Sequence, residues 1–165
     1  MNGIIIYKSN YGSTKQYATW LSEETGFTAV DIKKAGEKTI RGKNIVILGS
    51  PIFAGKPVIA GWINKKWKYL ADRKVILYTT SGAAPDDPSI RKVMENSFEP
   101  EIAGKIKYFP QGGSMVFAKL NPLHRFAMRL GSKMEKDPEI SANMLKDKDH
   151  VDRSGIKTII DYINN

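Results

Sequence analysis

Short apolar runs alternate with segments of helical periodicity along this chain, and this alternation limits the folds that it can adopt. The run Gly3–Tyr7 is too short and too rich in branched residues for an independent helix, so it predicts a buried strand. Similar runs predict further strands at 27–32, 44–48, 74–79 and 105–110. Strands separated by helices favour right-handed crossovers and a parallel sheet covered on both faces. We therefore expect an α/β fold with a doubly wound, five-stranded parallel sheet and helices on both faces.

Apolar side chains at helical spacing mark most of the segments between these runs. Ser13 with Gln16 three residues later matches a capping box, so the first helix should begin at Thr14. The pair Asp87-Pro88 is a cap and first-turn pair for a later helix. Helical stripes also cover 58–70 and 156–163.

The turn between the first strand and the first helix has the composition of an anion site. A helix N-terminus presents unpaired backbone N–H groups, and the hydroxyls of this turn add further donors. The P-loop pattern and the three-glycine dinucleotide pattern are both missing here. An ordinary tight turn and a phosphate cradle therefore both remain open. The residues of this first loop are Ser9, Asn10, Tyr11, Gly12, Ser13 and Thr14.

Two more loops follow predicted strands and should lie at the same edge of the sheet, where doubly wound proteins bind ligands. In the second loop, an exposed Phe53 would stack on a planar ring, whereas a buried one would close the local core. Small side chains in the third loop would let a flat ligand approach the backbone, or simply form a turn. The second loop contributes Pro51, Ile52, Phe53, Ala54 and Gly55, and the third contributes Thr80, Ser81, Gly82 and Ala83.

Composition limits the class of protein. With 165 residues and 41% hydrophobic content, we expect one domain over residues 1–165. No apolar stretch approaches the roughly 18 residues that cross a bilayer, and no secretory leader is evident, so we expect a soluble, cytoplasmic protein. The chain lacks cysteine, which excludes thiol chemistry. A net charge of +9 indicates anionic partners without choosing between a phosphate cofactor, nucleic acid, an anionic membrane and an acidic protein.

Taken together, the three loops resemble the flavodoxin family from Gly3 to about Pro110 and again in the last helix. The resemblance implies strand order 2-1-3-4-5 and flavin mononucleotide (FMN) as cofactor. It implies that the first loop holds the phosphate and that the second and third loops flank the isoalloxazine ring. It also implies that Gly55 is a backbone switch near the flavin. This chain departs from many flavodoxins in its basic charge and in having Ala83 and Ala84 in the third loop.

A basic amphipathic segment at about 115–136 is an addition to this pattern. Its apolar residues, from Leu120 to Met134, lie on one helical face, and Arg125, Arg129 and Lys133 lie nearly opposite. Two interpretations stay open: a helix packed on the sheet with a solvated basic back, and a binding surface. The segment resembles, more loosely, the membrane-associated, quinone-dependent protoporphyrinogen oxidases. That resemblance implies an anionic membrane surface at the inner face as partner, and it suggests either a proton-carrying or a structural role for His124.

These observations favour an FMN-binding, flavodoxin-like redox protein that transfers electrons to a redox partner protein or a quinone. The alternative is a flavoenzyme of the protoporphyrinogen oxidase type. A flavin-free module that binds nucleic acid is a remote third hypothesis, because the chain has no recognisable nucleic-acid motif and the three loops would then have no explanation.

Overall fold

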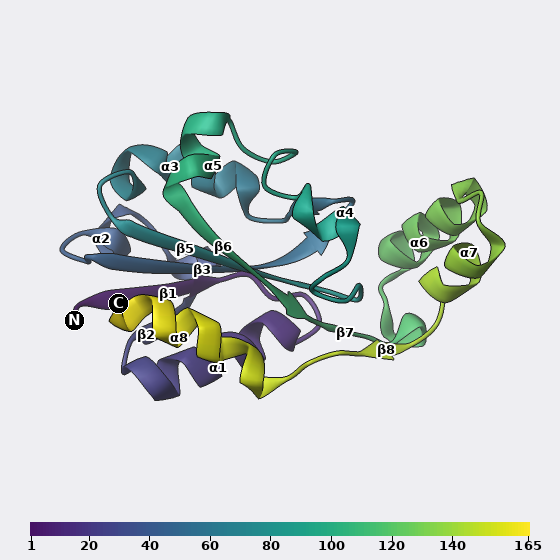
Figure 1. The fold of residues 1–165 in the computed structure, drawn as a ribbon, viewed down its shortest axis with the longest axis horizontal. Helices are drawn as coiled ribbons and strands as arrows, with labels where there is room; N and C mark the ends of the chain where they lie inside the picture. Colours follow the sequence, from purple (N-terminus) through teal and green to yellow (C-terminus); the bar gives the residue numbers. More distant parts are fainter.

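The computed structural model describes the backbone of residues 1–165 and every side chain except that of Arg91. Its centre is a parallel sheet in the order β2-β1-β3-β5-β6, with the short strand β4 paired antiparallel to the end of β3 (Figure 1). Leaving out β4, this is the predicted order 2-1-3-4-5, so the doubly wound α/β fold is confirmed. The strands are β1 (Gly3–Tyr7), β2 (Thr28–Asp31), β3 (Ile45–Phe53), β4 (Lys56–Pro57), β5 (Lys74–Ser81) and β6 (Ile106–Gly112).

Helices cover both faces of this sheet, and alternate residues of each strand bury against opposite layers (Figure 1). On one face Ile5 and Ile47 pack with α1 and α8, and on the other Ile6 and Leu48 pack with α3. Burial on both sides explains why the strands are continuous apolar runs. The helices of this body are α1 (Ser13–Thr25), α2 (Glu37–Ile40), α3 (Ala60–Leu70), α4 (Pro88–Arg91), α5 (Pro100–Lys105) and α8 (Ile156–Asn164), with short 3-10 turns at Ile32–Lys34 and Arg153–Gly155.

Two central strands are longer than their apolar runs. The predicted strand 44–48 continues to Phe53, and the predicted strand 74–79 continues to Ser81. The extensions pair with each other, with Ser50 opposite Thr79 and Pro51 opposite Thr80. Most of the second loop and the start of the third are therefore held by the sheet.

Residues 114–149 form an arm that projects from the carboxyl-end edge of the sheet (Figure 1). A two-stranded ribbon joins the arm to the body, and a helical hairpin forms its far end. Ser132 and Ser141 tie the two helices of the hairpin through reciprocal hydroxyl-to-carbonyl hydrogen bonds of 3.0 and 2.7 Å. The elements are β7 (Ser114–Met115), β8 (Lys148–Asp149), a 3-10 turn at Phe117–Lys119, α6 (Pro122–Met134) and α7 (Pro138–Met144).

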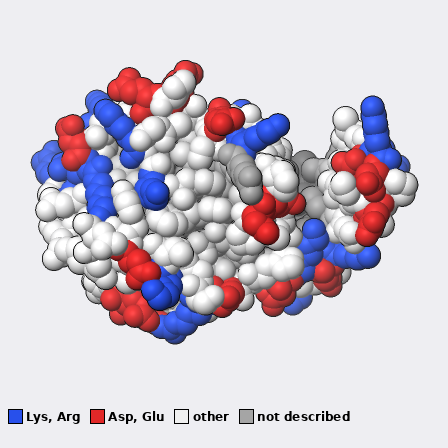
Figure 2. All heavy atoms as spheres, in the orientation of Figure 1, with Lys and Arg blue, Asp and Glu red and all other residues white. Residues whose placement is uncertain are grey.

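Acidic and basic side chains are interspersed on the face shown in Figure 2, over both the body and the arm. The net charge of +9 is therefore not gathered into one patch on this face. Within the part of the chain that the structure describes, no helix is both long and apolar enough to cross a membrane.

Candidate functional site

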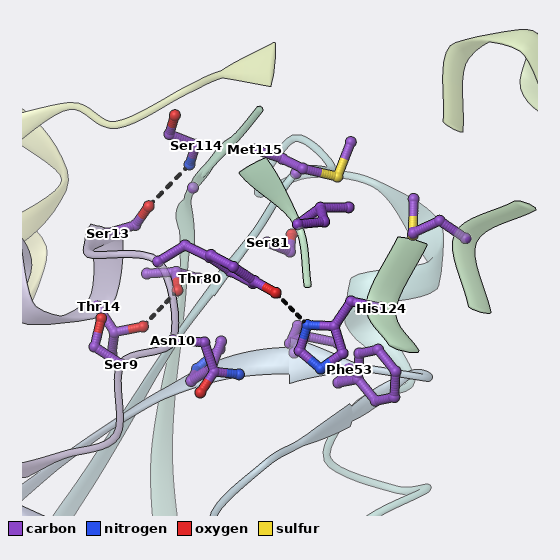
Figure 3. A pocket seen from close by; sticks show the side chains of 17 residues that line it. Ser9, Asn10, Ser13, Thr14, Phe53, Thr80, Ser81, Ser114, Met115 and His124 are labelled. Atoms are coloured by element: carbon purple, nitrogen blue, oxygen red, sulfur yellow. Dashed lines mark hydrogen bonds between the residues drawn. The ribbon is translucent and has the colours of Figure 1, made fainter. Parts of the chain in front are cut away.

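A cavity lies where β1, β3 and β5 end, at the edge of the sheet predicted to bind a ligand (Figure 3). It has a polar end at the N-terminus of α1 and an apolar side beside the end of β3. Most of the predicted residues meet there. The cavity is lined by Ser9, Asn10, Tyr11, Ser13 and Thr14 of the first loop, Pro51, Ile52 and Phe53 of the second, and Thr80, Ser81 and Gly82 of the third.

Four predicted residues lie outside the lining. Gly12 is the N-cap of α1 and shapes the first loop through its backbone, with φ of 107°. Ala54 and Gly55 form the turn of the β3–β4 hairpin, beyond the cavity edge, with φ of 49° and 75°. Ala83 follows the cavity residue Gly82, and its carbonyl accepts a hydrogen bond from the hydroxyl of Ser81. These positions set the form of the loops.

The polar end of the cavity is rich in hydroxyl groups whose hydrogens remain available. The Ser9 hydroxyl oxygen accepts the backbone N–H of Gly12 at 3.1 Å, and that of Ser13 accepts the backbone N–H of Ser114 at 3.0 Å. Because both oxygens already act as acceptors, each O–H can donate to a ligand. The first turn of α1 adds N–H groups that have no partner within the helix. This donor set suits an anion.

The predicted capping box at Ser13 and Gln16 is wrong. The helix begins one residue earlier, at Ser13, and its N-cap, Gly12, makes no side-chain cap hydrogen bond. The Ser13 hydroxyl binds the backbone of Ser114 in the β7 strand instead. The Ser13 side chain thus joins the first loop to the arm and does not cap the helix. The N–H groups at the start of α1 are left without a side-chain cap at the polar end of the cavity.

Thr14 is buried below this polar end and connects it to the third loop. Its hydroxyl lies 2.8 Å from that of Thr80, and its carbonyl accepts the hydroxyl of Tyr78 at 2.8 Å. Full burial raises the pKa of the Tyr78 hydroxyl well above its usual value, so this group stays protonated as a donor. Two residues of β5 therefore fix the start of α1 against the sheet.

The arm supplies the cavity wall that the loops alone did not predict. Apolar side chains from β7, the following turn and α6 face the loop residues across the cavity, and one histidine joins them. Helical spacing indicated α6, but no local pattern showed that its other side would close a cavity. The additional lining residues are Gly113, which directly precedes the arm, and the arm residues Ser114, Met115, Leu120, His124 and Met128.

His124 connects this wall to two of the predicted loops (Figure 3). Its Nδ1 lies 2.6 Å from the hydroxyl of Tyr11, and its ring stacks on Phe53 with centroids 4.6 Å apart. The backbone N–H of Asn121 donates to the same Tyr11 oxygen at 3.2 Å. The Tyr11 hydroxyl therefore links the His124 ring to the backbone at the start of α6. Phe53 remains 39% exposed, so its ring borders the cavity and does not close the core.

The outer side of α6 contradicts the interpretation in which this helix packs on the sheet and exposes its basic face. The apolar face of the helix does not pack on the sheet: Leu123 is 71% exposed and Phe126 is 65% exposed. Two of the three predicted basic residues have internal contacts. The Arg125 guanidinium donates to the carbonyls of Ala118 and Leu120, and Arg129 lies over the Phe117 ring. The helix therefore presents an apolar stripe to solvent.

Comparison with known proteins supports the fold. No curated protein matches the chain significantly. Among solved structures, a flavodoxin, WrbA-like protein from Agrobacterium tumefaciens is 16% identical with a TM-score of 0.52, covering 87% of this chain and 98% of that one. The Trp repressor binding protein from Bacillus subtilis is 13% identical with a TM-score of 0.52, covering 67% of this chain and 84% of that one. At such identities the likeness establishes the fold alone.

The sequence itself carries the family assignment. Residues 4–141 match the model of a flavodoxin domain family, so the match includes all three loops and most of the arm. Flavodoxin-like proteins use a flavin cofactor, and the cavity combines a hydroxyl-rich end with an apolar side. The chain belongs to this flavodoxin domain family.

Proposed function

We propose that this protein binds FMN in the cavity and acts as an electron-transfer flavoprotein. The observation that carries the proposal is the pairing of a hydroxyl-rich helix N-terminus with an apolar slot in one cavity. A phosphate would accept from Ser9, Ser13 and the first turn of α1. Bound flavin would supply the redox chemistry, while the chain binds and orients it.

The slot beside the phosphate end suits a flat ring system. Phe53 and Ile52 offer an aromatic face and an aliphatic edge, and Gly82 brings the backbone of the third loop close to the other side. Aromatic faces stack on planar rings at little conformational cost. In this arrangement Pro51 to Phe53 and Thr80 to Gly82 contact the ring, and the hairpin residues Ala54 and Gly55 lie at its margin.

Titration with two flavins tests the proposal. FMN and riboflavin share the ring and differ in the phosphate. We expect FMN to lose fluorescence on binding, with an affinity at least about tenfold higher than that of riboflavin, because the phosphate contributes charge-assisted hydrogen bonds. Equal affinities would contradict the assignment of the first loop. Failure of both flavins to bind would remove the flavin proposal.

A matched pair of threonine variants tests the role of the first turn of α1. Thr14 lines the cavity and Thr19 lies on the exposed side of the same helix. We expect Thr14→Val to weaken FMN binding more than riboflavin binding, because the Thr14 hydroxyl holds the first turn of α1, the proposed phosphate end, through its bond to Thr80. Thr19→Val, with the same chemical change, should bind both flavins like the parent chain. Equal losses in the two variants would indicate a general effect on the helix.

We further infer that the arm contacts an anionic membrane surface. The observation that favours this partner is the exposed apolar stripe of α6, because a helix that keeps its apolar face in solvent gains free energy by covering it. The helix carries cationic residues and no carboxylate, so an anionic surface complements it. Lys133 is exposed beside the stripe, whereas Arg125 is engaged internally. The stripe consists of Leu123, Phe126, Leu130 and Met134.

Vesicle sedimentation tests this inference. We expect binding to phosphatidylglycerol vesicles, weaker binding to phosphatidylcholine vesicles, and a loss of binding in Phe126→Gln. Val58→Gln is the control, since Val58 is similarly apolar and 43% exposed but lies on the body. Absence of binding to anionic vesicles would overturn the inference, as would a dimer in solution that Phe126→Gln dissociates. The comparisons do not favour the alternative of a protoporphyrinogen oxidase-type enzyme.

A further inference from the structure

We propose that His124 competes with the flavin ring for the face of Phe53 and thereby couples the position of the arm to occupancy of the cavity. The inference rests on the proposed function, because it concerns how this same cavity is filled. Its starting point is that an aromatic ring from the arm already stacks on Phe53, at 4.6 Å between centroids and 29° between planes.

The face that His124 covers belongs to the residue best placed to receive a flat ligand. Phe53 ends the β3 strand and borders the cavity, and His124 lines the same cavity from the opposite wall. Figure 3 shows the imidazole beside the Phe53 ring. The Nδ1 atom of the same imidazole lies 2.6 Å from the Tyr11 hydroxyl of the first loop. A planar ligand that stacks on this face must first displace the imidazole.

Displacing His124 also loosens the arm, because the same residues hold α6 in place. The Tyr11 hydroxyl binds both the His124 ring, at 2.6 Å, and the backbone N–H of Asn121, the N-cap of α6. Asn121 in turn caps the helix by accepting the backbone N–H of His124 at 2.8 Å. Tyr11, Asn121 and His124 thus join the start of α6 to the first loop. A ligand that moves Tyr11 or Phe53 changes the contacts of the arm.

Coupling of this kind is reciprocal. If flavin binding weakens the attachment of α6, then a contact that holds α6 against the cavity weakens flavin binding by the same factor. His124 is a positioning residue in this scheme, since it sets the arm and the access to Phe53. Any partner that pulls the arm away would then favour loading of the cofactor.

The competition predicts that replacement of His124 raises the affinity for FMN. We expect His124→Ala to bind FMN about two- to tenfold more tightly than the parent chain, because an aromatic stack and a hydrogen bond no longer need to be broken. His124→Phe keeps a ring that can stack on Phe53 but loses the hydrogen bond to Tyr11. Its affinity for FMN should therefore lie between those of the parent chain and His124→Ala. His150→Ala is the matched control, because His150 is the other histidine of the chain and does not line the cavity.

A spectroscopic readout separates competition from a general structural effect. The chain contains two histidines, so its proton NMR spectrum has two imidazole C2–H signals, which the two alanine variants assign. FMN should shift the His124 signal as the ring leaves Phe53, and should leave the His150 signal in place. Trypsin cleavage within 125–136 should become faster in the parent chain on addition of FMN, and should be fast in His124→Ala with or without it.

The outcomes distinguish this inference from the proposed function. Three results would overturn the competition and leave the flavin assignment standing. They are FMN binding with an unshifted His124 signal, weaker FMN binding by His124→Ala than by the parent chain, and slower trypsin cleavage of the arm in the presence of FMN. If no variant binds FMN, the flavin assignment fails and the competition fails with it. Tighter binding to His124→Ala than to His150→Ala, together with the shifted signal, supports both.

Discussion

The hydroxyls of Thr14 and Thr80 lie 2.8 Å apart across a sequence separation of 66 residues. Thr14 is in the first turn of α1, and Thr80 is near the end of β5, so this hydrogen bond joins the predicted phosphate loop to one of the predicted ring loops. Both side chains are buried and line the cavity. The contact therefore sets the spacing between the two ends of the proposed flavin site.

Thr80→Val should lower both stability and FMN affinity. The loss of the bond leaves a buried Thr14 hydroxyl without this partner, which costs about 1–2 kcal/mol of unfolding free energy. FMN binding should weaken about two- to tenfold as the first loop loses its support. Urea denaturation and fluorescence titration measure the two effects.

The neighbouring Thr79 provides the control for this prediction. Its hydroxyl bonds that of Tyr108 at 2.7 Å, on the opposite side of the same strand and outside the cavity lining. Thr79→Val should cost a similar free energy of unfolding while FMN affinity stays unchanged. A loss of FMN affinity in Thr79→Val as large as that in Thr80→Val would show that the Thr14–Thr80 contact has no special role.

Sequence periodicity predicted the framework of this site because burial on two faces leaves a strong local signal. The predicted strand Gly3–Tyr7 is β1 without change, and Asp87-Pro88 caps α4 as predicted. The strand extensions carry no such signal. Ser50 and Pro51 are not part of an apolar run, and their strand geometry comes from pairing with Thr79 and Thr80.

Contacts distant in sequence account for the remaining differences. The Ser13 hydroxyl has the spacing of a helix cap, but Ser114, 101 residues away, binds it in the folded chain. The amphipathic pattern of α6 predicted a helix correctly, yet periodicity does not say which face will be buried. Here the apolar stripe is outside and the face with His124 and Met128 lines the cavity. Such placement depends on tertiary packing that short-range spacing does not encode.

Gly49→Ala should be strongly destabilising. A Cβ atom at Gly49 would lie 2.2 Å from the hydroxyl oxygen of Tyr78, which is fully buried and bonded to Thr14. Relief of that overlap requires movement of a rigid ring at the base of the site, so we expect a loss of about 1–3 kcal/mol in the free energy of unfolding.

Gly61→Ala is the contrasting change. Among the described residues, nothing lies within 4 Å of a Cβ atom at Gly61, which is in α3, so alanine should stabilise the helix by about 0.5–1 kcal/mol. Urea unfolding of both variants at one pH checks the pair. Destabilisation by both substitutions to a similar extent would contradict the assignment of the Gly49 effect to Tyr78.

The Asp87 carboxylate should make the free energy of unfolding depend on pH in the acidic range. Its carboxylate accepts the hydroxyl of Ser89 at 2.6 Å and the backbone N–H of Ser89 at 2.8 Å, and these bonds hold its pKa below the usual value. A native pKa below the unfolded one adds stability above about pH 4 that disappears as the pH falls through the native pKa. Asp87→Asn keeps a capping oxygen but does not titrate. Urea unfolding should show that Asp87→Asn is less stable than the parent chain at pH 7, and that this difference in the free energy of unfolding shrinks as the pH is lowered to 3. A difference that stays constant over this range would contradict the assignment.

The turn of the β3–β4 hairpin has two successive residues with positive φ, and only one of them is glycine. Ala54 has φ of 49° and Gly55 has φ of 75°. A left-handed backbone costs a residue with a Cβ atom roughly 1–2 kcal/mol, and glycine avoids this cost. We therefore expect Gly55→Ala to lower the free energy of unfolding by about 1 kcal/mol or more, and Ala54→Gly to be neutral or mildly stabilising.

Because Phe53 directly precedes this turn, Gly55→Ala should also weaken FMN binding. Urea unfolding and FMN titration of both variants check the signs, and a stable Gly55→Ala would show that the turn relaxes to another conformation.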